Sequence, residues 1–384
     1  MVERSYFDHN ATTPLDPRVA EAMLPWLEER FGNPSSAHCR GREARETVES
    51  ARREVAEVLG ADPEEIVFTA SGSEANNSVV FEVARASGRE GKILLSSLEH
   101  PSVTRAAERC VGEGMTLQEI DPGPDGVVDA EKMIGALGPE TRLVCLMLAN
   151  NVVGTLQPVR EVASAARERG IPVLCDAVQA LGKVPVEPRS LAVDYLSLGG
   201  HKFHGPLGGA ALWIHPGAPF EGWLVGGGQE GGRRGSTPDV PAVAGLGEAC
   251  RLAREELSER REHLETLRER LEEGLSGIPD ARIHAVDAPR LPHTTCVSFR
   301  GLRGTELGPA LDRRGFQVST GPACGSGKPR PPEALLAMGV SEELALGTLR
   351  ISFGMTNTLA EVERFLPGLE REVQALRSRD AAPA

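Results

Sequence analysis

Positive charge is scarce in this chain of 384 residues. Its 42 Lys and Arg residues stand against 55 Asp and Glu residues, which gives a formal net charge of −13 and a pI of about 5.3. Such a chain offers no basic stripe to neutralise phosphates, so nucleic acid is not an expected partner. Apolar runs of membrane-spanning length are also lacking, and the first residues carry no signal-peptide pattern. We therefore expect a cytoplasmic protein that does not enter a membrane.

Cysteine pairs are lacking as well. The chain has 7 cysteines, an odd number, and none of them forms a Cys-x-x-Cys pair. Several lie in apolar runs, as Cys145 does in 143–148. Most are therefore expected to be buried small hydrophobes in a reducing compartment and not a disulfide framework. Cys324 differs, because it lies in a polar stretch rich in Gly and Pro, where nearby Lys328 and Arg330 favour its thiolate.

Short apolar runs alternate with amphipathic stretches between about residues 60 and 215. This alternation predicts an α/β unit with a mostly parallel sheet, because strands covered on both faces are apolar almost throughout. The expected strands are 66–69, 92–97, 143–149, 171–175, 193–198 and 209–214.

A second unit is predicted after a Gly- and Pro-rich loop at 217–241. Leu257, Leu264 and Leu271 recur at seven-residue intervals and indicate one long connecting helix from Glu248 to Leu275. A compact α+β unit follows, with strands at 296–299, 316–319 and 348–353, a loop at 320–331, and helices at 305–314, 332–338 and 359–377.

Two neighbouring predicted strands each end in a chemically useful side chain. Asp176 follows the run 171–175 directly, and Lys202 follows the run 193–198 after Gly199-Gly200-His201. An acid that keeps a pyridinium nitrogen charged and an amine that forms a Schiff base are what pyridoxal 5′-phosphate (PLP) needs from a protein. Taken singly, a surface acid and a solvated loop lysine explain these residues equally well or better. Few amines compete, however, because lysine occurs only at 92, 132, 183, 202 and 328.

Other strand ends carry polar groups to the same region. The turn at 68–77 leads from a strand into a helix near Ser73, and free amides at a helix start bind phosphate, although a plain capped turn looks the same. His100 and the pair Asn150-Asn151 each follow another strand, and Gln179 lies one turn beyond Asp176. Ligands bind at the carboxyl edge of open α/β sheets, so the combination favours a site over unrelated loop residues.

Arg350 lies inside the apolar strand 348–353, which suggests a guanidinium fork for a carboxylate, with a structural ion pair as the alternative. Metal binding is not expected. His201 and His204 have suitable spacing, but neither a His-Glu-x-x-His motif nor a cysteine cluster accompanies them.

With these residues in view, the chain resembles the PLP-dependent cysteine desulfurases of the iron–sulfur-cluster and nitrogen-fixation type, in the class V aminotransferase group of fold type I. The collinear segments that carry the resemblance are 8–14, 31–36, 68–77, 176–179, 199–206 and 349–354. It implies a large domain over 12–255 with a mostly parallel seven-stranded sheet flanked by helices. A smaller α+β domain would comprise 1–11 and 256–384 and carry the cysteine loop 320–331.

Carried over to this sequence, the resemblance implies PLP as the cofactor and Lys202 as its Schiff-base residue. Asp176 would pair with the pyridine nitrogen, and His100 would stack on the ring and manage protons. Further cofactor contacts would come from Gly72, Ser73, Asn151, Gln179 and His201, and from Thr237, which would reach the phosphate bound by the partner subunit of a homodimer.

The resemblance also implies the reaction. Arg350 and Asn151 would bind the carboxylate of L-cysteine, and Cys324 would take its sulfur as a persulfide and release L-alanine. The sulfur would pass to an acceptor or scaffold protein for iron–sulfur cluster or thio-cofactor assembly. No resident metal is implied, although Cys324 as a transient iron–sulfur ligand stays open.

Several positions depart from the family pattern. Gly199 stands where Ser is usual, Val152 where Glu is usual, Ser236 where Gly is usual, and Pro322 and Gly325 replace Ser and Thr around Cys324. Three alternatives stay open: a selenocysteine lyase, a class V aminotransferase of other amino acids, and a weakly active homologue that serves as a dimeric scaffold for sulfur relay.

Overall fold

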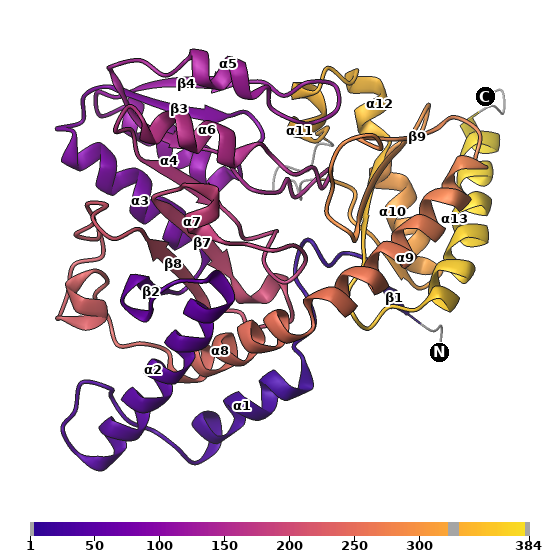
Figure 1. Ribbon diagram of the computed structural model, residues 1–384. Helices are drawn as coiled ribbons and strands as arrows, with labels where there is room; N and C mark the ends of the chain where they lie inside the picture. The colour runs from indigo at the N-terminus through magenta and orange to yellow at the C-terminus, as the bar shows by residue number, and fades with distance from the viewer. Residues whose placement is uncertain (1–3, 322–329, 381–384) are drawn as a thin grey trace.

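A seven-stranded sheet forms the centre of the computed structural model, which describes residues 4–321 and 330–380 (Figure 1). Its strand order is β2-β8-β7-β6-β5-β3-β4, and only β8 runs antiparallel to its neighbours. The predicted α/β fold with a mostly parallel sheet is therefore confirmed. The strands are β2 (Ile66–Thr69), β3 (Lys92–Ser96), β4 (Thr116–Ile120), β5 (Thr141–Cys145), β6 (Val173–Asp176), β7 (Tyr195–Gly199) and β8 (Ala210–Ile214).

Helices cover both faces of this sheet. Apolar side chains of α3 and α4 pack on one face, and those of α2, α6 and α8 pack on the other, which explains why the central strands are buried along their whole length. The helices of this unit are α1 (Pro17–Glu28), α2 (Cys39–Leu59), α3 (Gly72–Ala86), α4 (Pro101–Val111), α5 (Ala130–Gly135), α6 (Val159–Arg167), α7 (Pro188–Leu191) and α8 (Val240–Glu255), with short 3-10 turns η1 (Pro63–Glu65), η2 (Gly200–Lys202) and η3 (Gln229–Gly232).

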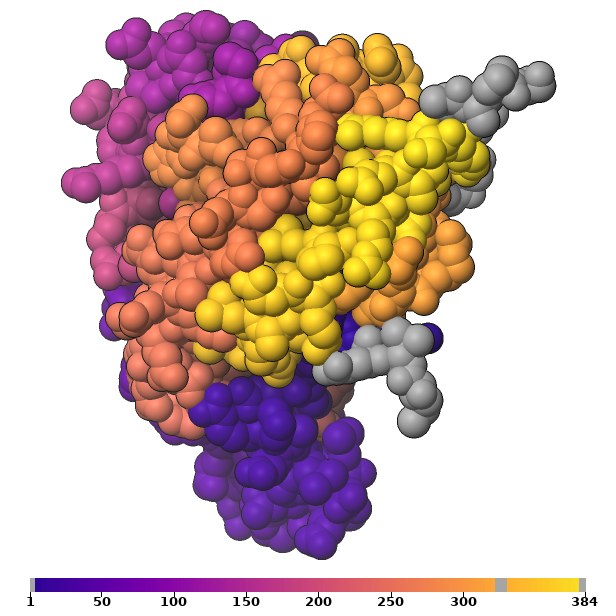
Figure 2. All heavy atoms as spheres, turned by 90° about the vertical axis from the view of Figure 1, so that its right-hand side faces the viewer, coloured from indigo at the N-terminus to yellow at the C-terminus, as the bar shows by residue number. Residues whose placement is uncertain are grey.

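The second unit, here called the C-terminal unit, has its own core. A three-stranded antiparallel sheet, β12-β10-β9, lies against α9, α10 and α13, and α9 and α13 run side by side across one face of the molecule (Figure 2). Its elements are β1 (Ser5–Tyr6), α9 (Leu257–Ser276), β9 (Ala281–Ile283), β10 (Thr294–Phe299), α10 (Gly304–Arg313), β11 (Phe316–Gln317), α11 (Glu333–Ala337), α12 (Glu342–Leu346), β12 (Thr348–Ser352) and α13 (Leu359–Asp380).

The connecting helix expected over 248–275 is in fact two helices. The α8 helix ends and α9 begins at Glu256, whose backbone angles (φ −104°, ψ 6°) are not helical. Its carboxylate accepts hydrogen bonds from Arg260 at 2.9 Å and from Arg18, which precedes it by more than two hundred residues. Because Arg18 is far from Glu256 in the chain, the leucine spacing around residue 256 does not indicate that the helix breaks there. Together α8 and α9 form a diagonal that links the two units in Figure 1.

The N-terminal segment also links the units. β1 pairs with β11, and Asp8 forms a bridge with Ser352 of β12. The chain then crosses to the large sheet, where the amide of Thr13 donates to the carbonyl of His201 at 2.9 Å. The division of the chain at 11/12 and 255/256 stays a prediction. In the described ranges, no helix combines the length and the apolar character needed to cross a membrane.

Candidate active site

Asp176 is the last residue of β6, and its carboxylate is held from two sides. One oxygen accepts the Asn76 side-chain amide at 2.8 Å, and the other accepts the backbone amide of Val178 at 3.0 Å. The side chain is 6% exposed. A buried carboxylate with a fixed orientation is suited to a charged ring nitrogen, because it loses no freedom when it pairs with one.

Lys202 lies at the end of η2, directly after β7, which is the parallel neighbour of β6. Its Nζ donates to the backbone carbonyl oxygens of Asn10 at 2.7 Å and Ala11 at 2.8 Å. Burial, together with the positive charge of Arg350, lowers the pKa of Lys202 to about 8. Such an amine is a nucleophile near neutral pH, and it is held by carbonyls that release it more readily than a carboxylate would.

His100 caps the N-terminus of α4, where its Nδ1 accepts the amide of Ser102 at 3.1 Å. Its outer side is exposed, yet loss of solvent around the ring lowers its pKa. The charge of Asp176 opposes this shift, and the charge of Lys202 adds to it. The structure thus brings the three residues into electrostatic contact at one edge of the sheet, and His100 caps α4 while it lies in this cluster.

The groups predicted to hold a phosphate also converge. The α3 helix begins at Gly72, with Ser71 as its cap and Ser73 exposed in its first turn, so amides of this turn face outward. A Cβ built on Gly199 would lie 3.8 Å from the His201 ring and 4.0 Å from the Gly72 amide nitrogen. Burial lowers the pKa of His201 to about 4, so at neutral pH its uncharged ring can donate one hydrogen bond.

Polar groups on the other side of Lys202 complete the cluster. Gln179 is buried, donates to the Asn10 carbonyl at 2.9 Å, and keeps its side-chain oxygen without a partner. Arg350 of β12 donates to the carbonyl of Asn151 at 2.9 Å and to the carboxylate of Asp8 at 2.6 Å. Part of the Arg350 fork is therefore bound internally, and an incoming carboxylate would have to compete with Asp8.

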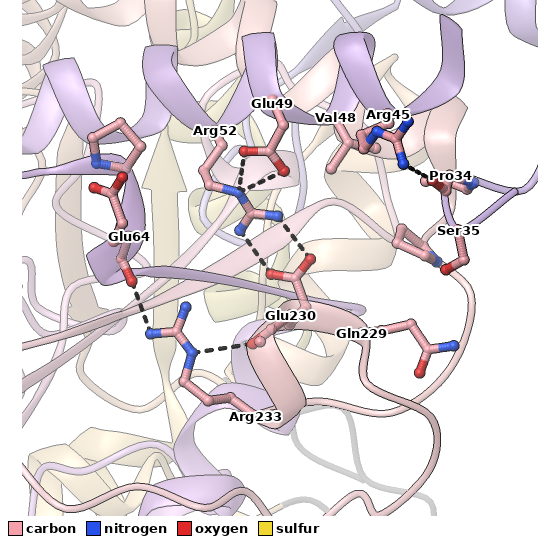
Figure 3. A pocket seen from close by; sticks show the side chains of 13 residues that line it. Pro34, Ser35, Arg45, Val48, Glu49, Arg52, Glu64, Gln229, Glu230 and Arg233 are labelled. Carbon is pink, nitrogen blue, oxygen red and sulfur yellow. Dashed lines mark hydrogen bonds and ion pairs between the residues drawn. The ribbon is translucent and has the colours of Figure 1, made fainter. Parts of the chain in front are cut away.

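Thr237 stands apart from these residues. It is exposed, and no hydrogen bond described in the structure joins it to the Lys202 region. The chain just before it is fixed by Glu230, which accepts Arg52 at 2.7 and 2.8 Å and the Phe68 amide at 2.8 Å (Figure 3). Arg52 and Glu230 border a pocket of about 310 Å³ that includes neither Asp176 nor Lys202. The chemistry is therefore not expected in this pocket.

Cys324 lies outside the described residues, as do Pro322, Gly325 and Lys328. The chain leads toward them beside Arg350, since Ser319 and Arg350 exchange backbone hydrogen bonds at 2.8 and 3.1 Å. Of the other thiols, Cys39 is exposed at the start of α2. The expected burial is confirmed for Cys110, Cys145, Cys175, Cys250 and Cys296.

Three residues of this cluster were assigned no role from the sequence. The Asn10 carbonyl accepts both Lys202 and Gln179, Asp8 binds Arg350, and Asn76 holds Asp176. The only available signal for Asp8 and Asn10 was the family segment 8–14, because their partners lie more than 160 residues away. In the described part of the chain, no group of three or more His, Cys, Asp or Glu side chains is placed to hold a metal ion.

The fold is an α/β fold with a mostly parallel sheet, and an acid and an amine lie at adjacent strand ends, as a PLP enzyme requires. The sequence pattern of the aminotransferase class-V family matches residues 5–365, and the chain belongs to this family. It is 41% identical to a cysteine desulfurase of Cereibacter sphaeroides (98% of this chain, 97% of the relative) and 39% identical to cysteine desulfurase IscS of Methanosarcina thermophila (97% and 93%). A solved NifS-like protein superposes with a TM-score of 0.91 at 38% identity, covering 97% of this chain and all of that one.

The family implies PLP, and the residues present fit it. Asp176 offers a buried acceptor, Lys202 a releasable amine, and Gln179 a buried oxygen that has no protein partner. The His201 ring and the Gly72 amide nitrogen are both neighbours of Gly199, so these three groups lie together at the start of α3. This donor set matches a flat, charged ring that carries a phosphate.

Proposed function

We propose that this protein is a PLP-dependent cysteine desulfurase that converts L-cysteine to L-alanine and takes the sulfur onto Cys324 as a persulfide. The observation that carries the proposal is the meeting of Asp176, Lys202 and His100 at the ends of β6, β7 and β3. Relatives named cysteine desulfurase, similar over nearly the whole chain, support the choice of reaction within the family.

In this proposal each residue has one task toward the cofactor. Lys202 would hold PLP through its Nζ, Asp176 would keep the ring nitrogen protonated, and His100 would stack on the ring. Asn151 and Gln179 contact ring substituents, while the amides of Gly72 and Ser73 and the ring of His201 hold the phosphate. When bound, PLP supplies an electron sink for charge that develops at the substrate Cα.

Toward the substrate, Arg350 and Asn151 bind the carboxylate. The Nζ of Lys202 would carry the Cα proton, a task suited to an amine whose pKa is lowered to about 8. The Cys324 thiolate attacks the substrate sulfur, and the carbon–sulfur bond breaks. Cysteine and the enzyme thiol thereby become alanine and an enzyme persulfide, with no outside oxidant. The persulfide then passes to an acceptor or scaffold protein by thiol exchange.

The proposal includes a homodimer. Val225 is 90% exposed and lies in the segment that pairs with Gly235, next to the exposed Thr237. Leu27 on α1 and Phe31 just after it are 63% and 72% exposed. Exposed apolar side chains are what a second subunit would cover, and Val225 is the one that adjoins the predicted phosphate contact.

Mass spectrometry of the PLP-bound protein after exposure to L-cysteine tests the function. The Cys324 peptide should gain the mass of one sulfur atom, and the Cys39 peptide, which carries an exposed thiol, should not. Cys324→Ala should keep the visible absorbance of bound PLP and stop alanine formation. Cys39→Ala should form alanine at the wild-type rate.

Lys202→Ala should remove the absorbance of the Schiff base. Full cysteine turnover in Cys324→Ala would overturn the assignment. Transamination of other amino acids in that variant would point to an aminotransferase, and far faster turnover of selenocysteine would point to a selenocysteine lyase.

A further inference from the structure

A small, partly open cavity is lined by Lys202 and lies between the large sheet and the C-terminal unit. Its volume is about 20 Å³, which exceeds the roughly 10–15 Å³ needed to hold one water molecule. Phe203 closes it from the large unit, and Leu264 and Phe353 close it from the C-terminal unit. Its polar walls are His9, Thr13, Lys183, Lys202, His204 and Arg260.

The polar side chains of this cavity are rich in donors. Lys183 is 4% exposed, and its Nζ makes one hydrogen bond, to the Gln179 carbonyl at 2.9 Å. A charged amine has three N–H groups, so two of them have no acceptor among the described residues. Lys202 already donates to the carbonyls of residues 10 and 11. His204 already bonds to the carbonyl of residue 14 and to the Met355 amide.

His9 is the second unsatisfied group. It is 1% exposed, and neither of its ring nitrogens makes a well-aligned hydrogen bond within the described part of the chain, although the Tyr6 carbonyl and the Asn357 side chain lie near enough to raise its pKa. A buried imidazole without a partner costs about 1–3 kcal/mol, so such groups normally meet water or an ion.

Charge around the cavity has one sign. None of the described residues that line it carries a carboxylate, and Glu256, the ion-pair partner of Arg260, is not among them. Lys183 is close enough to depress the pKa values of His9, His201, His204 and His293. Burial lowers the pKa of Lys183 itself to about 7. Whatever occupies the space must therefore accept hydrogen bonds and be neutral or negative.

We propose that this cavity is a binding site for one small hydrogen-bond acceptor, a water molecule or a halide-sized anion, held by Lys183 and His9. It bridges the two units directly behind the amine of Lys202. An anion here would keep Lys183 charged, and a water molecule would satisfy it without charge. The site depends on the folded chain and does not rest on the proposed reaction.

Crystal structures of the PLP-bound protein, grown once with sodium bromide and once with sodium gluconate, test the proposal. We expect a density peak in the cavity within hydrogen-bond distance of Lys183 Nζ and a His9 ring nitrogen. An anomalous signal in the bromide crystal identifies an anion, and a peak without that signal in either crystal identifies water. An empty cavity in both maps, at a resolution where other buried waters are seen, overturns the proposal.

Two variants test who holds the occupant. Lys183→Met keeps the length of the side chain and removes its donors, so the peak should disappear. Lys92→Met is the matched control, because Lys92 is bonded to Gln118 and Ala136 on another part of the sheet and the peak should stay. A peak that persists unchanged in Lys183→Met refutes the role of Lys183. The wild-type maps decide the question if that variant fails to fold.

Discussion

Replacement of Gly199 by serine is expected to tighten the binding of PLP. Gly199 ends β7 with ordinary extended angles (φ −142°, ψ 118°), so a side chain causes no backbone strain. A Cβ there would lie 3.6 Å from Val178, 3.8 Å from His201 and 4.0 Å from the Gly72 amide nitrogen, all ordinary contacts. The new hydroxyl would thus enter the space where the phosphate is proposed to bind, without displacing a neighbour.

The size of the effect follows from the charge of that phosphate. A hydrogen bond to a charged group contributes about 1.5–3 kcal/mol, and its lower end corresponds to roughly a tenfold change in Kd. Ordering the serine hydroxyl costs part of this free energy. We therefore expect the Kd for PLP to be about tenfold lower in Gly199→Ser than in wild type.

The assay is a titration of the PLP-free protein with PLP, followed by its visible absorbance. Gly199→Ala is the matched control, because it adds the same Cβ and the same restriction of the unfolded chain without the hydroxyl. The reasoning is refuted if the serine and alanine variants bind PLP equally well, or if both bind it more weakly than wild type.

Three further changes test other parts of the structure. Arg52→Met should lower the stability of the PLP-free protein by about 3–5 kcal/mol, because the Glu230 carboxylate, 3% exposed, loses its partner. The control is Arg45→Met at an exposed position, measured in the same thermal unfolding assay. Equal unfolding midpoints for the two variants would contradict the prediction. Leu271→Ala, in the fully buried core of the C-terminal unit, should cost about 2–5 kcal/mol, whereas Leu359→Ala, 45% exposed at the start of α13 in the same unit, should cost little in calorimetry. The rate of PLP binding to the PLP-free protein should rise with pH through about 8, because only the uncharged amine of Lys202 reacts; a midpoint near 10, as for a solvated lysine, would argue against a desolvated amine.

Strands buried on both faces were predictable, because burial demands continuous apolar runs. The run 66–69 coincides with β2, and 209–214 differs from β8 by one residue. The edge strand β4 was missed because it has one neighbour and half-exposed faces, so its sequence, Thr-Leu-Gln-Glu-Ile, carries no apolar run. The short strand β9, also at a sheet edge, was missed for the same reason.

For the candidate site, the sequence indicated the side chains that follow predicted strands. It did not indicate the contacts that join the N-terminal segment to Lys202 and Arg350. Asp176 and Lys202 stand at the ends of recognisable apolar runs, and parallel pairing puts such ends together. The contact of Lys202 with the Asn10 carbonyl joins residues 192 positions apart, and the link between Arg350 and Asp8 joins residues 342 apart. A local sequence pattern cannot indicate contacts between residues so far apart in the chain, so these two contacts are seen only in the folded structure.

The path of the N-terminal segment has a consequence for the order in which the molecule can be built. Residues 5–8 are paired with strands near 316 and 352, so they have no place to dock until those late strands exist. During synthesis the seven-stranded sheet is complete once residue 214 has emerged, while Asn10 must wait for the C-terminal unit. The nascent chain would therefore carry a folded sheet with Lys202 unrestrained by its carbonyl partners, and the site would close as one of the last events of folding.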